Sequence, residues 1–197
     1  DEIDISYFGV AGLNPVTIGG VEGNYYYDQV KEDFYFKRTQ AGEEVTISAP
    51  TRVITSAMKN RRENDILVLF IGSNNHYSSK NTDELIAIQE QMIKYSGSKK
   101  FIIVGLTSKD YMSEVDEVNA ILKERWGKNF VDLREYMMTE KCLTDNGITP
   151  TEQDLIDLAN GEIPSSLRTD TIHGNQTFYN IIADMVGDRM EALHYIR

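Results

Sequence analysis

From about Thr55 onward, short apolar runs alternate with segments that carry apolar residues at helical spacing. The runs "DILVLFIG" (65–72) and "FIIVGL" (101–106) are apolar without alternation, and "FVDL" (130–133) is a shorter version. Strands that are buried on both faces of a parallel sheet have this composition. The pattern therefore predicts three strands of a parallel sheet.

The segments between these runs predict helices, because their apolar residues lie three and four positions apart. The clearest are 82–95, with Leu85, Ile88 and Met92, and 113–125, with Val115, Val118, Ile121 and Leu122. Residues 133–140, 151–160 and 176–194 supply further helices. Strands that alternate with helices favour an α/β layered domain with a parallel sheet.

Residues 1–55 follow a different pattern and predict a small antiparallel β subdomain. Aromatic and β-branched residues gather in 24–28, 33–37 ("DFYFK") and 44–48 ("EVTIS"), and glycines separate these stretches. Short strands joined by tight turns have this composition. We therefore expect a β subdomain over 1–55 and an α/β domain over 56–197.

Composition and charge exclude several classes of protein. The 197 residues are 41% hydrophobic, enough to bury the core of one domain with a small appendage. A net charge of −11 leaves no basic face for nucleic acid or for an anionic membrane, and no apolar run approaches the length of a membrane span. Cys142 is the only cysteine, which excludes an internal disulfide and a thiolate-rich zinc site.

The first polar motif, "IGSNNHY" (71–77), follows the first apolar run directly. In open α/β sheets, ligands bind beyond the carboxyl ends of the strands. Gly72 permits a sharp exit from the strand, and the amide of Asn74 can point into a cleft. The alternative is an ordinary turn that ends the strand, since Gly, Ser and Asn are common turn residues.

The second motif, "RTDTIHGN" (168–175), places Asp170 three residues before His173 at the start of the last helix. A carboxylate beside an imidazole can fix its tautomer and stabilise the imidazolium, as a hydrolytic triad requires. Asn175 and Thr177 offer a cap for the helix. The alternative is a capping loop with a solvated histidine, because short motifs also match by chance.

The two motifs, in this order, resemble blocks of the SGNH (GDSL-type) hydrolase family. "GSNN" is similar to the Gly-x-Asn-Asp block, and "DTIHGNQTFYNIIADMV" is similar to the last block, so the resemblance spans residues 60–197. It implies a flavodoxin-like three-layer α/β/α fold that cleaves carboxylic esters with a Ser nucleophile. No metal or organic cofactor is needed for that reaction.

The resemblance also implies roles for individual residues. His173 would be the general base, Asp170 the carboxylate that orients it, and Asn74 an oxyanion-hole donor. Asn75 stands where the family usually has Asp, a position that is not among the catalytic groups.

Further segments resemble a phage-tail-associated and bacterial subgroup of this family. "GLNPVTIGGVEG" and "FYFKRTQAGEEVTISAPTRV" look like its β insertion, and "PTEQDLIDLANGEIP" and "SLRTDTIH" are similar to its C-terminal segments. The subgroup implies acyl or acetyl esters on carbohydrate as substrates. An extracellular, cell-surface or virion-associated location would fit, although the sequence itself names no compartment.

The Gly-Asp-Ser nucleophile block of the family has no counterpart in the chain. Ser6, Ser48 and Ser56 precede the Asn74 motif, but none follows a buried strand with the small residues that a nucleophile turn needs. The chain also does not begin with Met. We therefore expect the Ser on an upstream segment or a second polypeptide, which pairs with the edge of the strand at 65–71 that would otherwise be exposed.

Several alternatives stay open. "IDISYFGVAG" (3–12) is either the family's second block, with Gly9 or Gly12 as a backbone donor, or the first strand of the insertion. His76 and Tyr77 either line the cleft or pack ordinarily. A metal site made by His76, His173 and Asp170 lacks the tight His spacing of such sites.

The rival function is a non-enzymatic carbohydrate-binding or structural module. In that reading the β subdomain binds sugar rings through aromatic side chains on its strands. The candidates are Tyr25, Tyr26, Tyr27, Tyr35 and Phe36.

Overall fold

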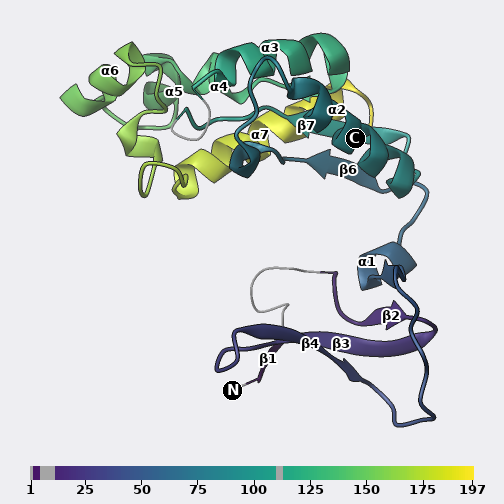
Figure 1. Ribbon diagram of the computed structural model, residues 1–197. Coiled ribbons are helices and arrows are strands. Elements are labelled where there is room, and N and C mark those ends of the chain that lie inside the picture. Colours follow the sequence, from purple (N-terminus) through teal and green to yellow (C-terminus); the bar gives the residue numbers. More distant parts are fainter. Residues whose placement is uncertain (1, 5–11, 110–112) are drawn as a thin grey trace. The chain divides into compact units, whose positions relative to one another are not determined.

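The computed structural model describes residues 2–4, 12–109 and 113–197. The chain divides into two compact units, Asp1–Glu63 and Asn64–Arg197 (Figure 1). The first unit extends beyond the expected boundary at residue 55 because it includes helix α1 (Ser56–Lys59). The backbone N–H groups of Ser56 and Ala57 donate to the carbonyls of Leu13 and Gly12 at 3.0 and 2.7 Å, which ties α1 to this unit.

The first unit is built on an antiparallel sheet. Its strands are β1 (Glu2–Asp4), β2 (Val16–Ile18), β3 (Val21–Asp28), β4 (Asp33–Arg38) and β5 (Val53–Ile54). They follow the order β1-β3-β2-β5, and β4 also pairs with β3. The predicted strands at 24–28 and 33–37 are therefore confirmed as parts of β3 and β4.

The predicted strand at 44–48 is wrong. Residues 44–48 are exposed and irregular, and Val45 and Ile47 remain 44% and 43% accessible to solvent. Two apolar side chains that stay this exposed gain little by burial, so the alternating pattern alone does not offset the entropy of ordering a strand.

The second unit contains the parallel sheet. Its strands β6 (Ile66–Leu69), β7 (Lys100–Val104) and β8 (Phe130–Val131) lie in the order β6-β7-β8 and pair in parallel. All three predicted strands are confirmed. This unit is therefore an α/β structure with a parallel sheet.

Six helices accompany the sheet in the part of the second unit that the structure describes. They are α2 (Thr82–Ser96), α3 (Val115–Trp126), α4 (Leu133–Met137), α5 (Glu140–Asp145), α6 (Glu152–Ala159) and α7 (Gln176–Ala192). All except α5 were expected from the apolar spacing. No helix among the described residues has the length and the apolar character to cross a membrane.

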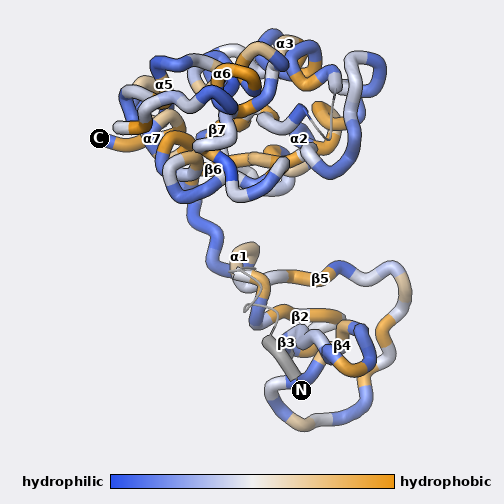
Figure 2. The backbone as a smooth tube through the Cα atoms, turned by 90° about the vertical axis from the view of Figure 1, so that its left-hand side faces the viewer, coloured by the Kyte–Doolittle hydropathy of each residue, from blue (hydrophilic) through white to orange (hydrophobic). Residues whose placement is uncertain are grey.

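The core covers both faces of β7. Ile103 packs with residues of α2 and α3 such as Leu85 and Leu122, whereas Ile102 packs with residues of α7 such as Ile181. Successive strand residues point to opposite faces, so helices on both sides explain the unbroken apolar run that identified the strand. Figure 2 shows the hydrophobic strand β6 beside β7 within this unit.

Strand β6 forms an edge of the sheet among the described residues. It pairs with β7 on one side, and no described strand pairs with its other side. Leu69 is buried, but Val68 and Phe70 are 40% and 39% exposed. An apolar strand with an open edge is a surface that another strand can pair with.

Candidate functional site

Asp170 and His173 contact each other in the loop between the 3₁₀ turn η4 (Ser165–Leu167) and α7. The Nδ1 atom of His173 lies 2.8 Å from Oδ2 of Asp170. The other carboxylate oxygen, Oδ1, accepts the backbone N–H groups of Ile172 at 2.8 Å and of His173 at 2.7 Å. One carboxylate thus shapes the loop and orients the imidazole.

The electrostatics of this pair suit an acid–base role. Hydrogen bonds from the backbone and the ring of His173, and from the backbone of Ile172, lower the pKa of Asp170 to about 2. The carboxylate is therefore ionised near neutral pH, and it favours the tautomer with a proton on Nδ1 and a free lone pair on Nε2. The side chain of His173 is 68% exposed, so the ring is open to a ligand.

Backbone hydrogen bonds close the loop that carries the pair. The N–H of Thr169 donates to the carbonyl of His173 at 2.8 Å, and the N–H of Asn175 donates to the carbonyl of Leu167 at 2.9 Å. The two ends of the loop are thereby joined. The Asp170–His173 pair rests on a short closed turn.

Asn175 begins the last helix, as predicted. Its Oδ1 accepts the N–H of Phe178 at 3.1 Å, and its Nδ2 donates to the carbonyl of Ser166 at 2.8 Å. The side chain therefore satisfies one of the open N–H groups of α7 and connects the helix to η4.

Asn74 lies in η2 (Ser73–Asn75), the short turn that follows β6, and it is exposed. Gly72 makes the sharp exit with a φ of 120°, a conformation that favours glycine. His76, at the end of the turn, is also exposed. Tyr77 is 6% exposed and packs in the core beside Leu85, so it does not line a cleft.

The exits of β6 and β7 lie side by side. Both strands run in the same direction, so their carboxyl ends share one edge of the sheet. A Cβ atom at Gly72 would lie 3.5 Å from Leu106, which follows β7. Asn74 therefore leaves the sheet next to the segment that follows β7.

The exit of β7 in turn meets the loop of His173. Thr107 and Ser108, after β7, line a small cavity together with Thr171 and Ile172. Ile172 is the immediate neighbour of His173. The contacts thus connect the β6 exit to the β7 exit, and the β7 exit to the loop that carries the imidazole.

The metal alternative is not supported. Among the residues that the structure describes, no group of three or more His, Cys, Asp or Glu side chains is placed to hold a metal ion. His76, His173 and Asp170 therefore do not form the metal site that was weighed from the sequence.

Ser48 and Ser56, which precede the Asn74 motif, are not placed as nucleophiles. Ser48 lies in the exposed irregular segment, and Ser56 is the first residue of α1 in the first unit. Ser6 and Gly9 lie outside the described residues. The strand β1 pairs with β3, so the start of the segment 3–12 belongs to the β sheet of the first unit.

Ser108 is a polar residue at the edge of the site that sequence reasoning missed. Its Oγ is buried and makes no hydrogen bond with any described residue. The signal was present, because Ser108 follows the second apolar run much as Ser73 follows the first. Ser108 differs from an ordinary turn residue only because it lines a cavity together with Thr171 and Ile172 of the His173 loop.

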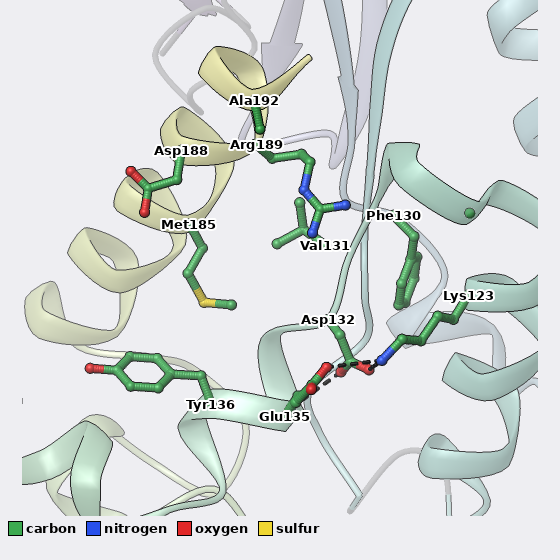
Figure 3. Close-up of a pocket in the computed structure, with 11 residues that line it drawn as sticks. Lys123, Phe130, Val131, Asp132, Glu135, Tyr136, Met185, Asp188, Arg189 and Ala192 are labelled. Carbon is green, nitrogen blue, oxygen red and sulfur yellow. Dashed lines mark hydrogen bonds and ion pairs between the residues drawn. The ribbon is translucent and has the colours of Figure 1, made fainter.

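A separate hollow of about 440 Å³ lies between α3, β8, α4 and α7 (Figure 3). Its Lys123 contacts Glu135 and Asp132 with N–O distances of 2.9 and 3.3 Å, and its Arg189 donates to the carbonyl of Lys128 at 2.7 Å. The positive charges are thus engaged within the protein. None of the predicted site residues lines this hollow.

The first unit has a hollow of about 520 Å³, but the aromatic residues named for sugar binding do not line it. The lining residues are Gly19, Gly20, Val21, Glu22, Arg38, Thr39, Gln40, Ala41 and Val45. Tyr26 stacks on Tyr35 with ring centroids 5.6 Å apart, and Tyr25 meets Phe36 edge to face at 6.1 Å. These rings pack across β3 and β4 against one another.

Comparisons with family models, with curated proteins and with solved structures find no match to this chain.

Proposed function

We propose that the protein is a serine esterase or acylhydrolase of the SGNH (GDSL) type, acting on acyl or acetyl esters of carbohydrates. The observation that carries the proposal is the Asp170–His173 pair, which joins a carboxylate oxygen to Nδ1 at 2.8 Å and leaves Nε2 available. The pair lies in a loop that contacts the exit of β7, the edge at which open α/β sheets bind ligands.

The proposed reaction uses His173 as the general base. A Ser Oγ attacks the ester carbonyl carbon while Nε2 of His173 takes the hydroxyl proton, and the amide of Asn74 donates to the oxyanion. The proton then passes from His173 to the departing alcohol oxygen, and an acyl-enzyme remains. Water attacks the acyl-enzyme carbonyl and gives a proton to His173; the bond to Ser Oγ then breaks, His173 returns the proton to Ser Oγ, and the acid is released.

We propose that the nucleophilic Ser lies on a further strand, which pairs with the open edge of β6 as in a flavodoxin-like three-layer fold. Val68 on β6 and Phe70 directly after it are partly exposed. On α2, Ile88, Met92 and Tyr95 are 39%, 41% and 44% exposed at spacings of four and three residues. A strand and helix from an upstream segment would cover both apolar surfaces.

Ester turnover by the full-length gene product tests the proposal. With a chromogenic acetyl ester, His173→Ala should lower kcat by about 10³–10⁴, and Asn74→Ala by about 10²–10³, because the general base and an oxyanion donor are lost. His194→Ala is the matched control, since His194 lies beyond the end of α7 and should leave the rate unchanged. Equal turnover by His173→Ala would refute the proposal, and sugar binding without turnover would favour the carbohydrate-binding module.

A further inference from the structure

Arg168 connects the loop of His173 to a buried carboxylate. Its Nη2 donates to Oδ2 of Asp157 at 3.1 Å and to Oγ of Ser165 at 3.2 Å, while Nη1 donates to the carbonyl of Thr171 at 3.3 Å. Thr171 lies between Asp170 and His173 in the sequence. The planar guanidinium therefore spans from the body of the unit to the loop.

Asp157 is a fixed anchor for this guanidinium. The side chain of Asp157 is 8% exposed, and its carboxylate accepts the N–H of Ser165 at 2.7 Å and the amide of Gln153 at 2.8 Å. Burial raises the pKa of Asp157, but the hydrogen bonds from Ser165 and Gln153 and the charge of Arg168 outweigh it and hold the pKa below its usual value. The anchor is thus an ionised carboxylate with its partners in place.

Two residues that line one small cavity beside this anchor each carry a buried polar atom. The Nε of Arg168 and the Oγ of Ser108 are buried, and neither makes a hydrogen bond with a described residue. Both residues line the cavity of about 10 Å³ that also includes Thr171 and Ile172. A volume of about 10 Å³ is at the lower limit for one water molecule, and unpaired buried polar groups are usually satisfied by water.

We propose that one buried water bridges Nε of Arg168 and Oγ of Ser108, and that Arg168 is the positioning residue of the Asp170–His173 pair. The water accepts the Nε–H and shares a hydrogen bond with the Ser108 hydroxyl. It thereby joins the exit of β7 to the loop that carries His173. The positioning role of Arg168 does not depend on which ligand the site binds. Only the effect of Arg168 on ester turnover rests on the proposed function.

Loss of the water bridge or of the Arg168 hydrogen bonds should change the tautomer ratio of His173 measurably. With the loop held, the ring of His173 keeps its proton on Nδ1, toward Asp170. When the water bridge or the hydrogen bonds from Nη1 and Nη2 of Arg168 are lost, the loop moves more freely. The preference of His173 for the Nδ1–H tautomer then weakens. The tautomer ratio is read from the ¹⁵N shifts of the two ring nitrogens at a pH where the imidazole is neutral.

The variants remove one part of the link at a time. Ser108→Ala removes one ligand of the water, and Arg168→Gln removes the fork and its charge. Each should lower the ratio of the Nδ1–H to the Nε2–H tautomer about fivefold, the factor expected for one net hydrogen bond. Arg168→Lys should restore the ratio only in part, because an ammonium cannot reproduce the planar fork. Arg189→Ala, which removes an arginine that donates to the carbonyl of Lys128, should leave the ratio unchanged.

A native tautomer ratio in folded Ser108→Ala and folded Arg168→Gln would overturn the inference. If Arg168→Gln does not fold, Ser108→Ala decides alone, since it only shortens one side chain. Failure of the proposed function is distinguished by the ester assay: a shifted tautomer ratio without turnover in the wild type supports the positioning role and contradicts the esterase.

Discussion

At the scale of single residues, buried carboxylates organise the segment that leads into the site. Asp154 is fully buried, and its oxygens accept the N–H and the hydroxyl of Ser166, both at 2.8 Å, and the N–H of Thr151 at 2.9 Å. Burial raises the pKa of Asp154, but the hydrogen bonds from Ser166 and Thr151 outweigh it, so the pKa lies below its usual value. The acidic stretch 151–162 therefore contains structural carboxylates and is more than the solvated helix face that its charge suggests.

Asp154→Ala should lower the free energy of unfolding by about 2–4 kcal/mol, because buried donors on Thr151 and Ser166 lose their acceptor. Urea denaturation measures the loss. Asp184→Ala is the control, since Asp184 is exposed on α7 and its removal should change stability by less than about 0.5 kcal/mol. Equal effects of the two variants would show that Asp154 has no special structural role.

The Asp170 carboxylate should titrate well below its ordinary value of 3.8, at about 2. A lowered pKa in the folded state gives stabilisation that is present above about pH 4 and is lost as the pH falls through about 2. Carboxyl ¹³C shifts measured against pH test this directly, with Asp170→Asn to assign the resonance. Titration near the ordinary value would mean that Ile172 and His173 do not hold this carboxylate.

At the scale of elements, apolar periodicity predicted the strands and most helices of the second unit, because their burial follows their own sequence pattern. The prediction failed at 44–48, where Val45 and Ile47 stay exposed. It missed α5, which is short and starts at the Thr139 cap. Pairing between Asp170 and His173 was accessible from the sequence because the two lie three residues apart. The cavity that Arg168 and Ser108 both line was not, since distant segments meet there only through the fold.

The cap of α7 gives a test at this scale. Asn175→Ala should destabilise the second unit by about 1–3 kcal/mol, because the helix loses its cap and η4 loses the bond to Ser166. Asn175→Asp keeps the capping acceptor and should recover part of the loss in thermal unfolding. Asn180→Ala, within the same helix, serves as the control. A cost for Asn180→Ala as large as that for Asn175→Ala would argue against the cap.

At the scale of the whole molecule, the open edge of β6 is the feature that the proposed function depends on most. Val68 is 40% exposed on a strand whose outer edge has no described partner. Exposed apolar edges promote strand-to-strand association. The chain of residues 1–197 alone should therefore self-associate, and Val68→Lys should raise its monomer fraction in analytical ultracentrifugation.

Val45→Lys is the control for this prediction, because Val45 is similarly exposed, at 44%, but lies in an irregular segment. It should leave the association unchanged. A wild-type chain that is fully monomeric at high concentration would contradict association through the edge of β6. Equal effects of Val68→Lys and Val45→Lys on the monomer fraction would contradict it as well.

The most direct measurement is the structure of the full-length gene product after reaction with a serine-directed phosphonate. We predict one adduct, on a serine at the end of a strand beside β6, with phosphonate oxygens within hydrogen-bond distance of the Asn74 amide and the His173 ring. His173→Ala should abolish the labelling. An adduct remote from these two side chains, or a reaction that proceeds unchanged in His173→Ala, would contradict the convergence of the two loops on one carbonyl.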